Sequence, residues 1–478
     1  MASRRTCSIH ISNSQVNKLL TVGINDMVNT RNQDSPGYLA MEEKISKKVI
    51  RHWMPLLILC YIIFFLDRIN ISVAALKMNT DIGITPTIFG LAAGIFFWTY
   101  AMSEIPSNYV LSRVGFRVWI PRIMITWGIV VIAMSAVQGG TSLTISRMLL
   151  GVAEAGFSPA MIYFVSCWLP RRKRGIALSI MLSSSCLSGL FVPLLAYIMV
   201  WTDGLGGIAG WRWIFIVTGI PAVITGIVCI FKIRDRPAQA TFLDQEERDW
   251  LTETLAAESE ELASTEKSSF VDGLKNVHVI ALFLVFLFFM FGLFGYQYWL
   301  PQMLATFNFS TVQVGWLAAL PPLISIGPMI WWARHSDRTG ERVMHFTVAA
   351  LIASVGFALS AAFIHNALVA ILGFCLAGLG LYIITGIFWT IPMNILSGAS
   401  LAAAIGLING LGSVGGFFGP QLVGITLERT GSYALGVGIF AVALLVSACG
   451  GLMFKFDQQR RQKSVEHTAP STPIVTHP

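Results

Sequence analysis

Charged side chains lie inside the most apolar stretches of this 478-residue chain. Asp67 and Arg68 stand in the stretch Leu66–Asn70, and Arg147 and Glu154 stand seven residues apart in another. Seven residues is almost two turns of an α-helix, so Arg147 and Glu154 would point to the same face. Charged groups in apolar surroundings are costly, and each therefore needs a reason.

These side chains are of the types that bind an anion and exchange a proton. An arginine in a dry cavity can hold a carboxylate with two hydrogen bonds. A buried carboxylate that exchanges contact with an arginine for contact with a substrate changes its affinity for protons. The alternative is a set of salt bridges that only hold helices together, but buried ion pairs are a poor source of stability.

Polar and aromatic residues in other apolar stretches are candidates to complete such a site. Tyr100 can donate a hydrogen bond to a substrate oxygen, with a packed aromatic ring as the alternative role. Glu104 follows one helical turn later, and it either lines the same cavity or pairs with an arginine. In the second half of the chain the candidates are Gln297, Trp389 and Asn409.

The composition predicts a membrane protein. Hydrophobic residues make up 55% of the chain and charged residues 12%, with a mean hydropathy of +0.68; soluble domains carry roughly 25% charged residues. The net charge of +8 comes from short clusters between apolar stretches, a pattern that sets membrane orientation and does not favour nucleic-acid binding. The seven cysteines form no CxxC pair, and no zinc-helix or serine-nucleophile motif is present. We therefore expect no metal, no cofactor and no enzyme activity.

The apolar stretches predict an all-α membrane protein with twelve transmembrane helices in two pseudo-symmetric six-helix bundles. A helix needs about 20 apolar residues to cross the hydrocarbon core. Stretches of that size occur at 53–75, 87–111, 117–136, 143–169, 174–200, 212–233, 278–303, 312–333, 343–364, 368–393, 400–427 and 433–455.

The expected domains follow from these stretches and from the loops between them. Lysine and arginine concentrate in alternate loops, so both termini and the central linker are predicted to be cytoplasmic. The polar N-terminal segment is expected to be disordered. The domains are an N-terminal extension at 1–48, a first bundle at 49–233, a linker at 234–277, a second bundle at 278–456 and a tail at 457–478.

Two patterns recur at almost the same offset, which indicates an internal duplication. Arg113-Val-Gly115-Phe-Arg117 returns 225 residues later as Arg338-Thr-Gly340-Glu-Arg342. The Gly-Leu-Phe-Val-Pro at 189–193 returns 227 residues later as the Gly-Phe-Phe-Gly-Pro at 416–420.

With these loops, the chain resembles the major facilitator superfamily. The loop at 334–342, which includes Asp337, is similar to the superfamily's signature between the second and third spans of each half. Ser112 stands where the signature of the first half would have an aspartate.

Within that superfamily the chain resembles the anion:cation symporters, over residues 44–456. This group includes bacterial tartrate, sugar-acid and aromatic-acid transporters. The residues that carry the resemblance are Leu66–Asn70, Trp98–Tyr100, Arg147–Glu154 and Gly156–Pro159.

The resemblance implies roles for single residues. Asp67 and Glu154 would couple transport to protons, with Arg147 as the switch partner between them. Arg68 and Tyr100 would hold the substrate carboxylate. Contacts from the second half would come from Gln297, Trp389 and Asn409, and the conformational loops would contain Arg113, Gly115, Arg117, Asp337, Arg338, Gly340 and Arg342.

The resemblance also implies a function, a monomer and a location in the inner or plasma membrane. The expected function is proton-coupled import of a small organic anion by alternating access, with lipid, the anion and protons as partners. A uniporter or exchanger remains the alternative, and a membrane sensor or membrane-embedded enzyme a distant one. Gly386 stands where sugar-acid transporters tend to place a hydroxyl, which favours a less polar or aromatic acid.

Overall fold

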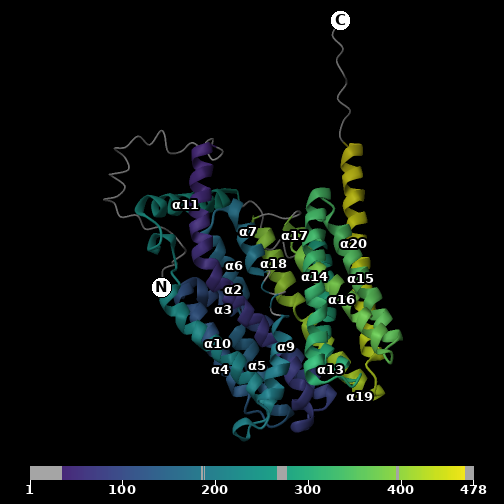
Figure 1. Cartoon of the computed structure of the whole chain (residues 1–478). Helices are drawn as coiled ribbons and strands as arrows, with labels where there is room; N and C mark the ends of the chain where they lie inside the picture. Colours follow the sequence, from purple (N-terminus) through teal and green to yellow (C-terminus); the bar gives the residue numbers. More distant parts are fainter. Residues whose placement is uncertain are drawn as a thin grey trace, which may run out of the picture.

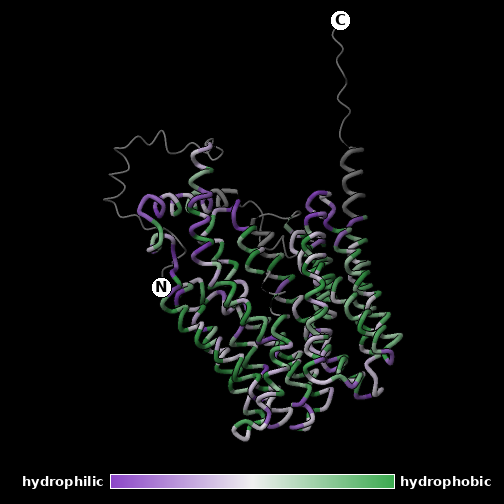
Figure 2. The backbone as a smooth tube through the Cα atoms, viewed as in Figure 1, coloured by the Kyte–Doolittle hydropathy of each residue, from purple (hydrophilic) through white to green (hydrophobic). Residues whose placement is uncertain are grey.

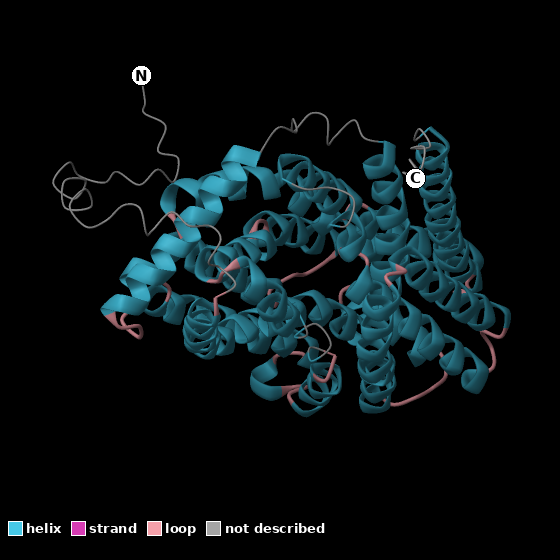
Figure 3. Ribbon diagram, turned by 90° about the horizontal axis from the view of Figure 1, so that it is seen from above, coloured by secondary structure: helices cyan, strands magenta, loops and turns pink. Residues whose placement is uncertain are grey.

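The computed structural model describes residues 35–182, 184, 187, 189–265, 277–393 and 398–468, and this part of the chain contains helices and no strands (Figure 3). The first half contains α2 (Pro36–Asp81), α3 (Pro86–Val114), α4 (Phe116–Met134), α5 (Gly140–Glu154), α6 (Phe157–Trp168), α7 (Arg171–Leu182), α9 (Phe191–Trp201) and α10 (Gly210–Lys232). The second half contains α13 (Val277–Ala305), α14 (Thr311–Thr339), α15 (Arg342–Ala362), α16 (Ala367–Ile387), α17 (Thr390–Met393), α18 (Gly398–Gly412), α19 (Gly415–Thr430) and α20 (Ala434–Thr468). Helix α11 (Gln245–Thr265) and 3₁₀ turns at Leu205–Gly207 and Pro237–Gln239 complete the described elements.

Ten of the described helical segments are long and apolar enough to cross a membrane. The two remaining expected spans are each divided. Of the fifth, 174–200, the structure describes α7 and α9, with residues 183, 185, 186 and 188 outside the described part and a turn at 189–190. The eleventh, 400–427, becomes α18 and α19. The division of the eleventh span accompanies a close approach to α13, since a Cβ added at Gly415 would lie 2.1 Å from the carbonyl oxygen of Leu287. The two divided spans hold equivalent places in the two halves, as a duplication predicts.

The first helix and the linker contain more structure than the sequence indicated. Helix α2 begins at Pro36, and the Ser35 side chain caps it by accepting a hydrogen bond from the Tyr38 N–H at 3.3 Å. Residues 36–48 are therefore helical and continuous with the first span, whereas residues 1–34 lie outside the described part of the chain. The expected linker contains α11, which lies across one end of the first bundle (Figure 1).

We call this end of the molecule the linker end, defined by α11 and the loop at Gly115, and the opposite end the far end, defined by the loop at Ile82–Thr85. Hydrophilic residues gather at the linker end, and the helices below it are mostly hydrophobic (Figure 2).

The two halves meet at the far end through small residues. Helix α3 packs on α19, α9 on α14, and α2 on α13. A Cβ added at Gly94 would lie 2.6 Å from the carbonyl oxygen of Phe417, and one added at Gly424 would lie 2.3 Å from that of Pro86. Only glycine allows backbones this close.

Toward the linker end the same face of α3 is exposed. Ile105 lies eleven residues after Gly94, about three helical turns, and therefore on the same side of the helix. Met102 is 70% exposed and Ile105 80%. Among the described residues the two halves are thus closely packed at the far end, while Met102 and Ile105, toward the linker end, are not covered by the second half.

Helix α11 is held to α2 by a buried carboxylate. The Glu247 side chain is 1% exposed and contacts Nζ of Lys48 at 2.6 Å and Nζ of Lys44 at 3.0 Å. Burial alone would favour the neutral acid, but the hydrogen bonds from Lys48, Lys44 and the Asp244 backbone lower the pKa of Glu247 to about 2. The stabilisation is therefore complete above the ordinary carboxyl pKa of 4.5 and is lost as the pH falls from there to about 2.

We expect Glu247→Gln to loosen α11 at neutral pH. Glutamine keeps an acceptor oxygen but not the charge, and both lysines are about half exposed, so docking should weaken by about 1 kcal/mol. Hydrogen–deuterium exchange of the purified protein should show faster exchange in α11 than in wild type at pH 7, and wild type should gain the same exchange only below about pH 4.5. Equal exchange in the two proteins at pH 7 would show that this carboxylate does not hold the helix.

Candidate functional site

Arg68 and Glu154 form an ion pair between α2 and α5. Arg68 Nε donates to Glu154 Oε1 at 2.8 Å, and the Glu154 side chain is 1% exposed. Glu154 is the last residue of α5, and Gly156, which directly precedes α6, has a φ of +86° in the left-handed region that favours glycine. This break places the carboxylate at the end of a helix, and its second oxygen is buried without a hydrogen-bond partner among the described residues.

Aromatic rings enclose the Arg68 guanidinium. Its central carbon lies 4.2 Å from the ring centre of Phe64, 5.3 Å from that of Phe96 and 5.1 Å from that of Tyr100. A cation against aromatic faces is stabilised by the ring electrons and shielded from water. Tyr100 and Arg68, predicted from the sequence to act together, are therefore neighbours.

Arg147 is buried on α5, and its hydrogen bonds do not go to the two predicted carboxylates. Its Nε and Nη2 donate to the carbonyl oxygens of Ala92 and Ala93 at 3.3 and 3.4 Å, and Nη2 also donates to the Tyr298 hydroxyl at 3.1 Å. Tyr298 belongs to the second half, so this bond joins the halves. The sequence placed Arg147 between Asp67 and Glu154; the structure describes one state in which it bonds to neither, and its switching role stays a prediction.

Asp67 points into the first bundle, away from its neighbour Arg68. It is 1% exposed, and its Oδ2 accepts a hydrogen bond from Trp127 Nε1 at 2.7 Å. The Asn70 amide reaches Asp67 Oδ1 at 3.4 Å and the Thr218 hydroxyl at 3.0 Å. Asp67 is thus held by neutral donors from α2 and α4, and its proton-coupling role stays a prediction.

The predicted contacts from the second half lie in three different places. Asn409 Nδ2 donates to Glu104 Oε1 at 3.0 Å, which joins α18 to α3. Gln297 lines a small cavity between the halves, beside Ile69. Trp389 packs in an aromatic cluster, with its ring centre 5.2 Å from that of Phe286. Only Asn409 of these three contacts a charged residue of the first half.

The sequence missed Tyr298 and Trp127 as partners of the buried charges. Tyr298 lies in the aromatic sequence Tyr296-Gln297-Tyr298. Its hydrogen bond to Arg147 joins residues 151 positions apart, so the local sequence does not indicate it. Trp127 is 60 residues from Asp67, and nothing in its local sequence marks it as a hydrogen-bond donor to that carboxylate.

The two conformational loops are held differently. In the second half, Arg342 forms an ion pair with Asp337 within the loop, Gly340 has a φ of +70° and Arg338 is exposed. In the first half, Gly115 has a φ of +83°, and the Arg117 N–H donates to Asp235 Oδ1 at 2.9 Å.

Asp235 therefore stands at the loop that lacks the signature aspartate. It comes from the segment after α10 and caps the start of α4, while Arg113 turns to the Tyr109 hydroxyl on its own helix. The linker thus supplies an acidic side chain to a loop where the sequence has Ser112.

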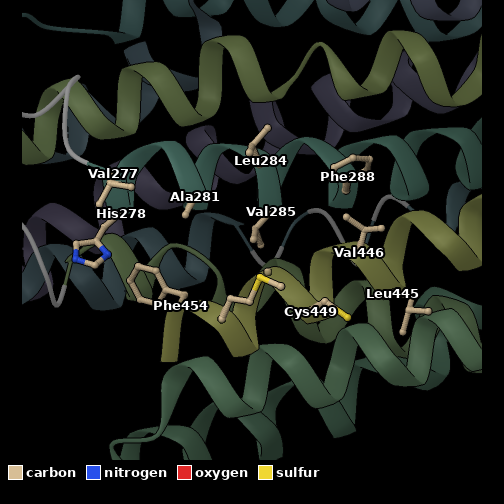
Figure 4. Close-up of a pocket in the computed structure, with 12 residues that line it drawn as sticks. Val277, His278, Ala281, Leu284, Val285, Phe288, Leu445, Val446, Cys449 and Phe454 are labelled. Atoms are coloured by element: carbon tan, nitrogen blue, oxygen red, sulfur yellow. The ribbon is translucent and has the colours of Figure 1, made fainter. Parts of the chain in front are cut away.

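A separate apolar cavity lies between α13 and α20 (Figure 4). Leu284, Val285, Leu445 and Phe454 line it, with His278 at one end. It contains none of the buried carboxylates or arginines, so it does not offer the chemistry of the charged site. Among the described residues no group of three His, Cys, Asp or Glu side chains is placed to hold a metal ion.

This duplicated helical fold, with charged groups buried among its apolar helices, is that of a membrane transporter. The family model described as Major Facilitator Superfamily matches residues 57–420. The chain belongs to the Major Facilitator Superfamily, which confirms the fold class expected from the sequence.

Relatives and solved structures agree with this assignment. The chain is 41% identical over 410 residues to a protein of Agrobacterium vitis named "Putative tartrate transporter", covering 85% of this chain and 94% of that protein. It is 33% identical to the inner membrane transport protein RhmT of Escherichia coli, over 80% and 89% of the two chains. The structure of a D-xylose-proton symporter matches with a TM-score of 0.69 at 16% identity, over 85% and 98% of the chains. An inward-facing bacterial homologue of the lysosomal transporter Spinster matches with a TM-score of 0.66 at 18% identity, over 84% and 96%.

Proposed function

We propose that this chain imports a small organic anion together with protons across the inner or plasma membrane, as a monomer with cytoplasmic termini. The observation that carries the proposal is the ion pair between the half-buried Arg68 and the buried Glu154. An incoming carboxylate can take the place of Glu154 on the Arg68 guanidinium, because both are planar acceptors that fit the same donors. Glu154 then lacks its cationic partner in a site without water, and this favours binding of a proton by its carboxylate.

Charge balance links the two events. A carboxylate that loses its arginine and stays ionised is a buried, unpaired charge, which is strongly unfavourable. Proton binding by Glu154 removes that charge, so substrate and proton would bind together and leave together. Asp67, held by the neutral donors Trp127 and Asn70, is the second proposed proton carrier, and Arg147 is its proposed switch partner.

The relatives guide the choice of anion. Two similar proteins are named as tartrate transporters, which favours tartrate or a related hydroxylated acid. The glycine at position 386 favoured an aromatic acid instead, and that expectation remains open to the same test.

Uptake by the purified protein in liposomes tests the proposal. Labelled tartrate, malate, galactonate, nicotinate and phthalate would be offered with and without an inward proton gradient, beside protein-free liposomes. Accumulation of one acid that collapses with the gradient would support proton-coupled symport. Equilibration without accumulation would favour the uniporter or exchanger, and no uptake of any acid would contradict the substrate class.

A further inference from the structure

We propose that Glu104 reads a hydroxyl group on the substrate, so that the site selects hydroxy acids over their counterparts without the hydroxyl. The proposal rests on the proposed function in one respect, that Arg68 holds the substrate carboxylate. It adds a second recognition point, contributed jointly by the two halves.

Glu104 is a buried carboxylate in which one of the two oxygens accepts no hydrogen bond from the described residues. Its side chain is 8% exposed, and Oε1 accepts the hydrogen bond from Asn409 at 3.0 Å. Its other oxygen, Oε2, is buried and has no partner among the described residues. Buried polar atoms are nearly always hydrogen-bonded, and one left without a partner costs free energy. A donor is therefore expected to bind at Oε2 during the transport cycle.

The position of Glu104 on α3 places its free oxygen, Oε2, near the Arg68 site. Glu104 follows Tyr100 by four residues on α3, so the two side chains share a face one turn apart. Tyr100 in turn lies against Arg68, with 5.1 Å from its ring centre to the guanidinium carbon. One helical turn rises about 5.4 Å, which is within the reach of a short hydroxy acid from its carboxylate to its hydroxyl.

Arg68 and Glu104 carry opposite charges and therefore bind different groups of the substrate. Arg68 only donates, so it takes the substrate's carboxylate. An ionised Glu104 only accepts, so it takes a donor such as a hydroxyl and repels a second carboxylate at the same place. A site built to bond a hydroxyl discriminates strongly against the analogue without it, because the protein's acceptor is then left unpaired.

The Asn409 bond fixes the orientation of the carboxylate. Because Asn409 occupies Oε1, the free oxygen is the one available to the substrate. Asn409 comes from the second half, so the acceptor is complete when α18 lies against α3, as it does here. Glu104 would thus sense the substrate and the relative position of the halves together.

Equilibrium binding to the full-length protein in detergent, by isothermal titration calorimetry, tests the proposal without requiring transport. The probes are malate against succinate and 3-hydroxybutyrate against butyrate. Wild type should bind the hydroxylated member of each pair about 10- to 100-fold more tightly, as expected for a hydrogen bond to a charged group.

Glu104→Gln is the decisive variant because it keeps the size of the side chain. Its carbonyl oxygen can still accept from Asn409, which turns an N–H donor toward the substrate. That N–H can still donate to the substrate hydroxyl, so a neutral hydrogen bond replaces a charge-assisted one. We expect the preference for the hydroxylated acids to fall about tenfold, with little change for succinate and butyrate. Glu428→Gln is the matched control, since Glu428 accepts from the Thr87 N–H at 2.9 Å between α19 and α3 at the far end; it should keep the wild-type preference.

Other outcomes overturn the assignment in distinguishable ways. An unchanged preference in Glu104→Gln would show that Glu104 does not read the hydroxyl. Equal weakening of both members of each pair would mean that the Glu104–Asn409 bond only joins the halves. If wild type bound no acid of either kind, the proposed function would fail and this assignment with it.

Discussion

Arg68→Ala should abolish binding of the organic anion. Removing one partner of a buried, hydrogen-bonded charge pair costs about 2–5 kcal/mol, which is roughly a 30- to 5,000-fold loss of affinity. The loss is expected to be at the upper end, because the substitution removes the cation that holds the substrate and also leaves Glu154 without its partner. Isothermal titration calorimetry of wild type and variant with the transported acid measures it directly.

Arg68→Lys separates the charge from the geometry of the guanidinium. Lysine keeps a positive charge but offers a single ammonium in place of a planar fork, so we expect affinity between those of wild type and Arg68→Ala. The thermal unfolding midpoints of both variants show whether they are folded. A folded Arg68→Ala protein that bound the acid as tightly as wild type would remove Arg68 from the site.

Glu154→Gln should separate transport from proton coupling. Glutamine keeps the size of the side chain and an acceptor for Arg68 Nε, but it neither carries a charge nor exchanges a proton near neutral pH. We expect the variant to bind the acid and to exchange labelled for unlabelled acid across the liposome membrane. Uptake driven by a proton gradient should fall to the equilibrium level, a loss of at least about tenfold in accumulation, since one pH unit corresponds to a factor of ten.

Two assays on the same liposomes check this separation. Counterflow measures exchange, and uptake with an imposed pH gradient measures accumulation. Accumulation by Glu154→Gln against a concentration gradient would show that the coupling carboxylate is a different residue, with Asp67 the next to test by Asp67→Asn. Loss of counterflow as well would place Glu154 in substrate binding or in the conformational change instead.

The sequence predicted the parts of this fold that depend on local composition. Apolar length gave the membrane spans, and the repeated loops gave the duplication. It could not predict where the eleventh span divides, because the division depends on packing, such as the approach of Gly415 to α13. The helical start of α2 was also missed, since the residues after Pro36 form no apolar stretch long enough for a span and the capping residues Ser35 and Pro36 are its main signal.

The sequence predicted which residues form the candidate site better than it predicted which of them contact one another. Asp67, Arg147 and Glu154 are buried and Arg68 is half-buried, as charges inside apolar stretches suggested. Their partners follow from helix packing: Arg147 bonds to carbonyl oxygens of α3, and Glu104 meets an amide 305 residues away. Spacing along one helix carries no information on such contacts.

The glycine contacts at the far end determine which solution and membrane conditions affect the opening of that end. Gly94 and Gly424 bring backbone against backbone, and the ion pairs and hydrogen bonds of the charged site lie elsewhere. Parting these surfaces breaks many weak dispersion contacts together with the exposed hydrogen bond from Thr87 to Glu428, and it uncovers little buried charge. The rate at which the far end reopens should therefore depend weakly on ionic strength and strongly on the lateral pressure and thickness of the bilayer. The lipid composition would then control how fast the transporter becomes able to bind its next substrate.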